Sequence, residues 1–379
     1  MFLQSCENQG TDTEKSENEE EIENKGETNG QKENDDEEVT YQGGSDVFIT
    51  ADRIETLKDR IESVQEPIYS AYQDLMSQEK ELLEREPHVP DTWYVPLFYV
   101  DAEGHRRSKA DLMIDANTSY KLALLYRLTG ESKYAEAAAK IINAWSYLED
   151  MRTHDDSSLS FSYHFPSMIF AADLLRGSVY LTEDLANRFA DFVRERALPM
   201  NTMDRSNNWG NWGLVLVLAS ASFLGDDALL EEGIEKWKYF IEEQIAEDGH
   251  LPHEVTRNSG IGERGIWYTH FTLMPQTIAA EIAYVNGVDL YDYESPSGRT
   301  LELAYRRVAP WAHNPDDFPY FRPEYEGQEQ RGTDYVSYFE ILHSRWPHPA
   351  AAAMLKQQRP TDAAHSAPVL TLTHGEPLN

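Results

Sequence analysis

Apolar residues recur every three to four positions over most of the chain, which is the spacing of helices with one buried face. Between Ser132 and Leu148, for example, Ala138, Ile141 and Trp145 fall on one such face. The same pattern predicts helices over Asp52–Leu82, Leu112–Leu128, Ser132–Leu148, Phe165–Leu181, Thr182–Ala197, Trp209–Leu224, Asp226–Ile245, Trp267–Val285, Thr300–Ala312 and Tyr335–Arg345. No series of alternating apolar and polar residues competes with it, so the pattern predicts an all-α fold.

Short polar links such as Thr129-Gly130 join most successive helices, and short links make neighbouring helices antiparallel. Helical hairpins that recur over about 300 residues predict an α/α toroid, or incomplete α/α barrel, whose inner helices line one cavity. A linear solenoid of helix pairs is the alternative, although no fixed repeat signature is visible in the sequence.

The chain divides into three segments by composition. Residues 1–45 carry fourteen Asp or Glu residues, three Lys residues and almost no apolar side chains, which predicts a disordered acidic tether. Residues 46–346 hold the helical pattern and form the predicted toroid domain. Pro347 and Pro349 interrupt the last helix, so residues 347–379 are expected to be a C-terminal tail.

The net charge of the chain constrains its partners. The formal charge is −34, of which the first 45 residues contribute −11. A surface this acidic argues against nucleic acid or an anionic membrane as a partner. An anionic polymer is compatible with it only if Arg and Lys gather in the groove that binds the polymer.

Cys6 is the single cysteine, so neither an intrachain disulfide nor a cysteine-based zinc site is expected. Leu3-Gln4-Ser5-Cys6 resembles the lipobox of a bacterial lipoprotein, and no stretch approaches the roughly 20 apolar residues of a membrane span. We therefore expect an exported monomer, either a periplasmic or cell-surface lipoprotein with a lipid anchor at Cys6, or a secreted protein. The alternative is that Cys6 is incidental.

Candidate catalytic residues gather between positions 207 and 268. β-Elimination at a uronic acid removes the C5 proton next to the carboxylate while O4 of the leaving group gains a proton. The carboxylate charge must be offset by donors such as Asn or Arg, and a Tyr can act as base, acid or both. Asn208, Arg257 and Tyr268 have these chemical types, which indicates a lyase acting on an acidic polysaccharide. Sequence spacing leaves open whether they converge.

Other residues of the same stretch and of aromatic segments nearby are candidates for substrate binding. They are Trp209, Trp212, Tyr99, Tyr163, Arg264, His270 and Glu254. Each also has a purely structural interpretation: the aromatic residues are equally suited to the core, and Glu254 is suited to hold Arg257 in place. Asn207 and Asn208 could simply cap a helix.

Several motifs resemble the alginate lyase (poly-mannuronate lyase) family. They are Asn207-Asn208 at a helix start, Asp248-Gly249-His250-Leu251-Pro252-His253-Glu254-Val255-Thr256-Arg257, Arg264-Gly265-Ile266-Trp267-Tyr268, Asn286-Gly287-Val288-Asp289-Leu290-Tyr291, and the stretches Leu128–Ala135 and Ala144-Trp145. The resemblance covers roughly residues 50–345. It implies an α/α toroid, metal-free β-elimination, a catalytic Tyr at Tyr268, a carboxylate-binding Asn at Asn208 and a matching Arg at Arg257.

The chain departs from the family pattern at two places. The family usually has His directly after the Asn, and this chain has Trp209; the interval between Arg257 and Tyr268 is also lengthened. The first departure predicts that another imidazole takes over the neutralising role. His164 and His253 are the preferred pair, because both are expected where loops meet inner helices.

Two other functions remain open. A glycoside hydrolase on the same scaffold would need two placed carboxylates, for which Glu254 with Glu263 or Asp248 could serve. A non-catalytic lipoprotein that captures oligosaccharides is favoured if Trp209 replaces an essential His. No metal-ligand spacing and no phosphate-binding loop stand out, so no metal and no cofactor are expected.

Overall fold

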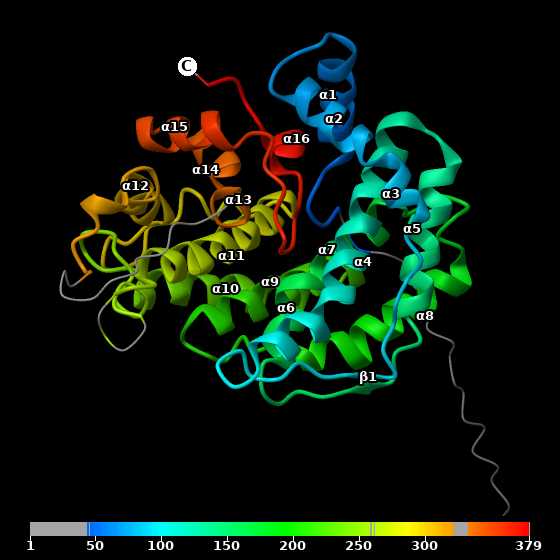
Figure 1. The fold of residues 1–379 in the computed structure, drawn as a ribbon, viewed down its shortest axis with the longest axis horizontal. Helices are drawn as coiled ribbons and strands as arrows, with labels where there is room; N and C mark the ends of the chain where they lie inside the picture. The colour runs from blue at the N-terminus through cyan, green and yellow to red at the C-terminus, as the bar shows by residue number, and fades with distance from the viewer. Residues whose placement is uncertain (1–43, 45, 258–259, 261, 322–332, 379) are drawn as a thin grey trace, which may run out of the picture. The chain divides into compact units, whose positions relative to one another are not determined.

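The computed structural model describes residues 44, 46–257, 260, 262–321 and 333–378, and these described residues pack as one unit (Figure 1). Residues 1–43 and 45, which carry the predicted tether and Cys6, lie outside the described residues. Among the described residues, no helix combines the length and the apolar character that crossing a membrane requires.

The unit is built almost entirely from helices. The α-helices are α1 (Ala51–Glu62), α2 (Ile68–Ser77), α3 (Glu79–Glu84), α4 (Ala102–Thr129), α5 (Ser132–Trp145), α6 (Ser157–His164), α7 (Pro166–Leu174), α8 (Glu183–Phe192), α9 (Asn208–Leu224), α10 (Asp227–Gln244), α11 (Gly265–Val285), α12 (Leu301–His313), α13 (Thr333–Val336), α14 (Phe339–Arg345), α15 (Pro349–Gln358) and α16 (Leu370–His374). Shorter turns are η1 (Val193–Ala197), η2 (Leu198–Met200) and η3 (Pro315–Asp317). Strands β1 (Thr92–Trp93) and β2 (Asp150–Met151) form a parallel pair with Thr92 opposite Asp150.

Glycine ends two of the hairpin-forming helices. Gly130 follows α4 with φ 76° and Gly225 follows α9 with φ 70°, a left-handed conformation that glycine adopts without steric cost. In both hairpins the next helix begins within two residues, at Ser132 and Asp227. The tight turns make α4 antiparallel to α5, and α9 antiparallel to α10.

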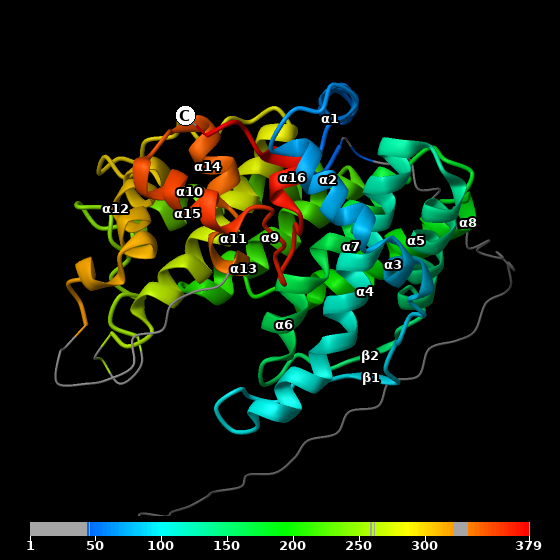
Figure 2. The same ribbon diagram turned by 45° about the horizontal axis from the view of Figure 1, so that its top comes forward.

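The helices form an inner and an outer layer (Figures 1 and 2). In the inner layer α4 packs against α7, α7 against α9, and α9 against α11; α5, α10 and α12 cover them from outside. Every residue of α7 is buried, and α9 and α11 are buried on nearly all sides, whereas the outer helices bury one face. This arrangement is the predicted α/α toroid.

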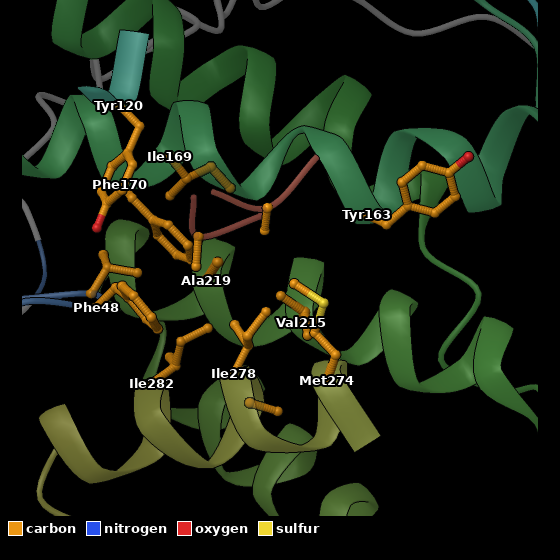
Figure 3. Packing of buried hydrophobic residues seen from close by; sticks show 14 of the residues in the cluster. Phe48, Tyr120, Tyr163, Ile169, Phe170, Val215, Ala219, Met274, Ile278 and Ile282 are labelled. Atoms are coloured by element: carbon orange, nitrogen blue, oxygen red, sulfur yellow. The ribbon is translucent and has the colours of Figure 1, made fainter. Parts of the chain in front are cut away.

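The core lies where the inner helices meet (Figure 3). Ile169 of α7 faces Val215 of α9 and the α11 residues Met274 and Ile278, which are one helical turn apart. At one end of this cluster Phe48 stacks on Phe170 of α7 with ring centroids 4.7 Å apart. The residues before α1 therefore belong to the same core.

Several predicted helix boundaries differ from the structure, and the two largest differences lie in the first third of the chain. The helix predicted from Asp52 to Leu82 is divided into α1, α2 and α3, and Pro67, which cannot continue a helix, lies between the first two. The helix predicted from Leu112 begins ten residues earlier, at Ala102, where the Asp101 side chain accepts a hydrogen bond from the Gly104 backbone N–H. The earlier start brings basic side chains of α4 toward the site.

The segment after Trp346, expected to be a tail, contains helices α15 and α16 and packs within the unit. The Arg53 guanidinium donates to the Thr373 backbone carbonyl at 2.7 Å, and Arg60 pairs with Glu376 at 2.8 Å. These contacts join the end of the described chain to its first helix. The apolar residues of this segment are too irregularly spaced to predict that packing.

Candidate active site

A cavity of about 490 Å³ opens between α4, α6, α9, α11, α13 and the C-terminal segment. Its lining residues are Leu97, Phe98, Tyr99, His105, Arg106, Lys109, Asp156, Leu159, Tyr163, Asn208, Trp209, Arg257, Arg264, Trp267, Tyr268, Phe271, Tyr335 and His365. Half or more of these side chains carry a polar or charged group, and the rest are mainly aromatic. This composition suits a sugar polymer better than an apolar ligand.

Asn208 reaches the cavity from the first residue of α9. The preceding residue, Asn207, caps the helix by accepting a hydrogen bond from the Trp209 backbone N–H at 3.1 Å, which frees the Asn208 side chain for other contacts. The Asn208 amide nitrogen lies 3.3 and 3.4 Å from the two carboxylate oxygens of Glu254. Asn208 is therefore held at the cavity wall by a buried carboxylate beneath it.

Glu254 is almost fully buried and connects Asn208 with Arg257, whose guanidinium lies 4.0 Å from its Oε2. Burial raises the pKa of Glu254 above its ordinary value, while Arg257 and Asn208 act in the opposite direction. Its two partners thus compensate the charge only in part. Hydrogen-bond donors of Asn208 and Arg257 therefore remain available to an anion in the cavity.

A glycine lets the Glu254–Arg257 turn approach α11. At Gly265, the first residue of α11, an added Cβ would lie 2.2 Å from the Val255 carbonyl oxygen, so any larger residue would push the turn away. The close approach places the Arg257 guanidinium carbon 4.1 Å from the centroid of the Tyr268 ring. Arg257 can therefore act on both a bound anion and the Tyr268 phenol.

Tyr268 projects into the cavity from the first turn of α11. Its hydroxyl oxygen lies 2.6 Å from that of Tyr99, a residue whose side chain is 66% exposed. Burial and the hydrogen bond with Tyr99 raise the pKa of Tyr268 above its ordinary value, and the Arg257 guanidinium opposes this. The Tyr268 phenol is thus protonated at rest and is linked to solvent through Tyr99.

The charges that line the cavity are opposite in sign to the charge of the whole protein. Four basic side chains (Arg106, Lys109, Arg257 and Arg264) line it in a chain with a formal charge of −34. Asp156 is the one carboxylate among the described residues that line it. Basic groups in a partly enclosed cleft concentrate anionic ligands.

Seven of the predicted site residues meet at this cavity. They are Tyr268, Asn208, Arg257, Trp209, Tyr99, Tyr163 and Arg264. Glu254 lies beneath them in contact with Asn208 and Arg257, the position expected of a residue that holds Arg257. Trp212 is fully buried one turn after Asn208, so it supports the cavity from below and offers no face to a sugar.

The structure does not bring the remaining predicted histidines to the cavity. His253 is exposed on the turn before Arg257 and is not among the lining residues. His164 is 1% exposed at the end of α6, and burial lowers its pKa well below the ordinary value, so it carries no charge. The His270 Nδ1 lies 2.8 Å from the Tyr338 hydroxyl, away from the cavity. The spacing of these histidines in the sequence could not show which way their side chains point.

The sequence analysis missed several lining residues, chiefly His105, Lys109, Asp156 and His365. The first two lie on the early part of α4, before the helix predicted from Leu112, and their separation of four residues on one helix face is the signal that could have found them. The His105 Nε2 is 3.5 Å from Asp156, and burial with Lys109 and Arg106 lowers the His105 pKa to about 4. No feature of the sequence indicates that His365 lies near the other residues that line the cavity.

The arrangement also tests whether the cavity could serve a glycoside hydrolase or hold a metal ion. Neither Glu263 nor Asp248 lines the cavity, and Asp248 instead pairs with His250 and, at 3.4 Å, with Arg307. The two facing carboxylates that a glycosidase needs are thus not assembled by the described lining residues. Within the described ranges, no cluster of three or more His, Cys, Asp or Glu side chains could hold a metal ion.

The chain shares sequence with known proteins over its central part. A sequence model of the alginate lyase family matches residues 63–318. A polysaccharide lyase of Stenotrophomonas maltophilia is 32% identical over 115 residues, covering 30% of this chain and 32% of that protein. An alginate lyase of Cobetia marina is 28% identical over 132 residues, covering 35% and 32%. The matched segments thus span about a third of the length of these relatives.

Solved structures share the fold over nearly the whole chain. Alginate lyase A1-III from Sphingomonas species A1 superposes with a TM-score of 0.71 at 19% identity, covering 88% of this chain and 98% of that one. An alginate lyase from Bacteroides ovatus gives a TM-score of 0.66 at 17% identity, covering 88% and 100%. The structural similarity establishes the common α/α toroid. Because the sequence identities are low, the chemistry has to be argued from the site itself.

Proposed function

The chain belongs to the alginate lyase family, and from this premise we propose that it cleaves a uronic-acid polysaccharide by β-elimination. The substrate is alginate, in particular poly-mannuronate, or a related polyuronate such as glucuronan. The observation that carries the proposal is the convergence of Asn208, Arg257 and Tyr268 in a basic cavity of an otherwise acidic protein. Each of the three has a separate task in the reaction.

Asn208 and Arg257 bind the carboxylate of the sugar at which elimination occurs. Both line the cavity, and both retain donors beyond their long contacts with Glu254. Their hydrogen bonds draw charge from the carboxylate and so make the neighbouring C5 proton more acidic. Because an amide and a guanidinium supply this compensation, the proposed reaction needs no metal and no cofactor.

Tyr268 transfers the proton. Its phenol first loses a proton to solvent through the exposed Tyr99 hydroxyl, and the Arg257 guanidinium stabilises the phenolate that remains. The phenolate takes the C5 proton, the electron pair of the C5–H bond forms the C4–C5 double bond, and the C4–O4 bond breaks. The re-formed phenol then donates its proton to O4, so that base and acid are the same atom.

The aromatic side chains around the cavity are proposed to bind neighbouring sugars of the polymer. Trp209 is half-buried at the cavity wall, and the Arg205 guanidinium carbon lies 4.0 Å from its ring centroid. Tyr163 and Arg264 line the same space. We propose that Trp209 stacks on a sugar ring and that Arg264 pairs with a further carboxylate.

The test of the function is the nature of the products. Purified protein is incubated with alginate, mannuronan, guluronan, glucuronan and glycosaminoglycans, and ultraviolet absorbance together with new reducing ends is followed. A lyase generates an ultraviolet-absorbing C4–C5 double bond with every cut. Reducing ends without absorbance would instead identify a hydrolase, and neither signal with measurable binding would identify a binding protein.

Export is proposed from the sequence alone. We propose that the protein acts outside the cytoplasm as a monomer, either as a periplasmic or cell-surface lipoprotein anchored at Cys6 or as a secreted enzyme. Cell fractionation and mass spectrometry of the N-terminal peptide test this. Recovery of an unmodified Cys6 peptide in the cytosolic fraction would reject it.

A further inference from the structure

The C-terminal segment supplies one wall of the cavity. His365 lines it, although this residue is almost a hundred positions beyond the motif that ends at Tyr268. Figures 1 and 2 show the segment, in red, running between α13 and α7. The His365 side chain is 5% exposed, so the segment buries it within the site.

The backbone on both sides of His365 is fixed to inner helices. Before it, the Asn117 amide nitrogen of α4 donates to the Ala364 carbonyl at 3.3 Å. After it, the Ser366 backbone N–H and hydroxyl both donate to the Tyr163 carbonyl, at 2.8 and 2.9 Å. These bonds determine where the imidazole points.

The chain after His365 also adopts conformations that side chains rarely take. Ala367 and Val369 have φ of 60° and 59°, in the left-handed region that a β-branched residue strongly disfavours. Such backbone persists only when surrounding contacts over-determine it, and it is frequent at functional sites. The loop is thus held firmly in an unfavourable shape that presents His365 to the cavity.

Two ring contacts locate His365 relative to the catalytic residues. Its ring centroid is 5.3 Å from Trp212, at an interplanar angle of 27°, and 5.5 Å from Phe271. Trp212 follows Asn208 by four residues on α9, and Phe271 follows Tyr268 by three on α11. Because residues three or four apart share a helix face, His365 lies one helical turn below both Asn208 and Tyr268.

One nitrogen of the ring is available to a ligand. The Nδ1 of His365 is buried and has no hydrogen-bond partner among the described residues. Because Nδ1 is enclosed while the residue lines the cavity, we infer that Nε2 is the nitrogen that faces the cavity. The neutral ring can carry its single proton on Nε2 and donate it to a ligand there.

We propose that His365 is a substrate-contacting residue whose Nε2–H donates a hydrogen bond to the uronate carboxylate held by Asn208 and Arg257. The proposal rests on the proposed lyase function and adds a third carboxylate ligand, from the opposite end of the chain. His365 thereby takes the task that neither His164 nor His253 is placed to perform.

The groups around His365 make it respond to the bound anion. The titratable groups that face it are Lys109 from α4, Tyr163 and His164 from α6, and Tyr335 from α13, while α9 and α11 present Trp212 and Phe271. Burial and Lys109 lower the pKa of His365 to about 3, so the imidazole is neutral in the empty cavity. A carboxylate beside Nε2 favours the protonated form and raises this pKa.

The experiment compares His365→Phe, which keeps a flat ring without nitrogen, with His365→Gln, which keeps a donor that does not titrate. His343→Gln is the matched control, because His343 is a buried imidazole of α14 that does not line the cavity. Double-bond formation on mannuronan and glucuronan is measured between pH 5 and 10, and melting temperatures are recorded for all variants.

We expect His365→Phe to lower kcat/KM by about 10- to 100-fold, the effect of losing a hydrogen bond to a charged group. In the wild type, kcat should reflect two titrations: a gain as the Tyr268 phenolate forms and a loss as the complexed imidazole deprotonates. His365→Gln should retain more activity than the Phe variant and show only the gain with rising pH. His343→Gln should keep the wild-type rate and profile. If the Phe variant does not fold, the pH profile of the Gln variant decides.

Wild-type rates and an unchanged pH profile in His365→Gln, together with cleavage by the wild type, would overturn the role of His365 and leave the lyase function intact. A wild type that forms no double bond on any polyuronate, under conditions where it is folded, would overturn both. The two failures are therefore distinguishable.

Discussion

Helix α11 has a buried carboxylate near each end, and the two are partnered in different ways. Glu281, on its last turns, accepts a hydrogen bond from the Tyr291 hydroxyl at 2.6 Å and lies 3.5 Å from both Arg345 and His374. Glu254, beside the first turns, has the 3.3–3.4 Å contacts with Asn208 and the 4.0 Å contact with Arg257. Both glutamates are almost fully buried.

The pKa values of the two glutamates shift in opposite directions. Burial raises the pKa of each, but at Glu281 the partners His374, Tyr291 and Arg345 outweigh burial and lower it to about 2. At Glu254 burial prevails, and the pKa stays above its ordinary value. At Glu281 the neighbouring donors are used on the carboxylate itself, whereas at Glu254 they are left partly available to a ligand. We attribute the first to stability and the second to function, and five substitutions test this division.

The largest expected effect is at Tyr268. Tyr268→Phe removes only the oxygen that carries the proton, so turnover should fall by about a thousandfold or more while binding and melting temperature stay near wild type. In the wild type, the raised pKa of Tyr268 should make the rate increase as pH rises above neutral, because the phenolate fraction increases. Initial rates of double-bond formation measure both, and a Phe variant with substantial activity would exclude Tyr268 as the proton carrier.

The next effect concerns the donors that Glu254 leaves available. Asn208→Ala and Arg257→Ala should each reduce turnover by about 100- to 1000-fold, the usual cost of losing a charge-stabilising donor at the reacting group. Arg345→Ala is the matched control, since it removes an arginine from the Glu281 cluster and should affect melting temperature without affecting turnover. Wild-type kinetics in both cavity variants would mean that the carboxylate is bound elsewhere.

At the opposite end of α11 the effect is on stability. Glu281→Gln should lower the free energy of unfolding by about 3–5 kcal/mol, because Arg345 and His374 lose a buried counter-charge. A lowered folded-state pKa contributes stability that is present above the unfolded value of about 4.3 and lost as pH falls toward 2. Denaturant unfolding of wild type and variant should therefore differ at pH 7 and converge below pH 4. Equal stability at pH 7 would show that the cluster contributes little.

Glu254→Gln should have the smallest effect on stability and the opposite sign. A raised folded-state pKa gives stability that is full below about pH 4.3 and is lost as pH rises through the folded value, so the ionised carboxylate destabilises the fold at pH 7. The Gln variant should be as stable as wild type or slightly more stable at pH 7, while turnover falls about tenfold because Arg257 is less well positioned. A large loss of stability at pH 7 would make Glu254 equivalent to Glu281.

The sequence determined the helical hairpins and the family motifs. Periodic apolar residues and the turn glycines Gly130 and Gly225 act locally, so they can be detected without knowing the fold. Asn208, Arg257 and Tyr268 could be predicted because the family motifs specify particular residue types at particular positions. Their convergence, and the basic lining that an acidic protein needs for an anionic substrate, came from the structure.

Only the tertiary structure showed which histidine reaches the cavity and that the C-terminal segment forms one of its walls. His164 and His253 have the right chemistry, but the end of α6 points the first into the core and the turn exposes the second. His365 had no motif around it, and its placement depends on hydrogen bonds to Asn117 and Tyr163, more than 200 residues away. Contacts between segments so distant in sequence leave no periodic pattern in either of them, because each partner needs only a suitable donor or acceptor at a single position.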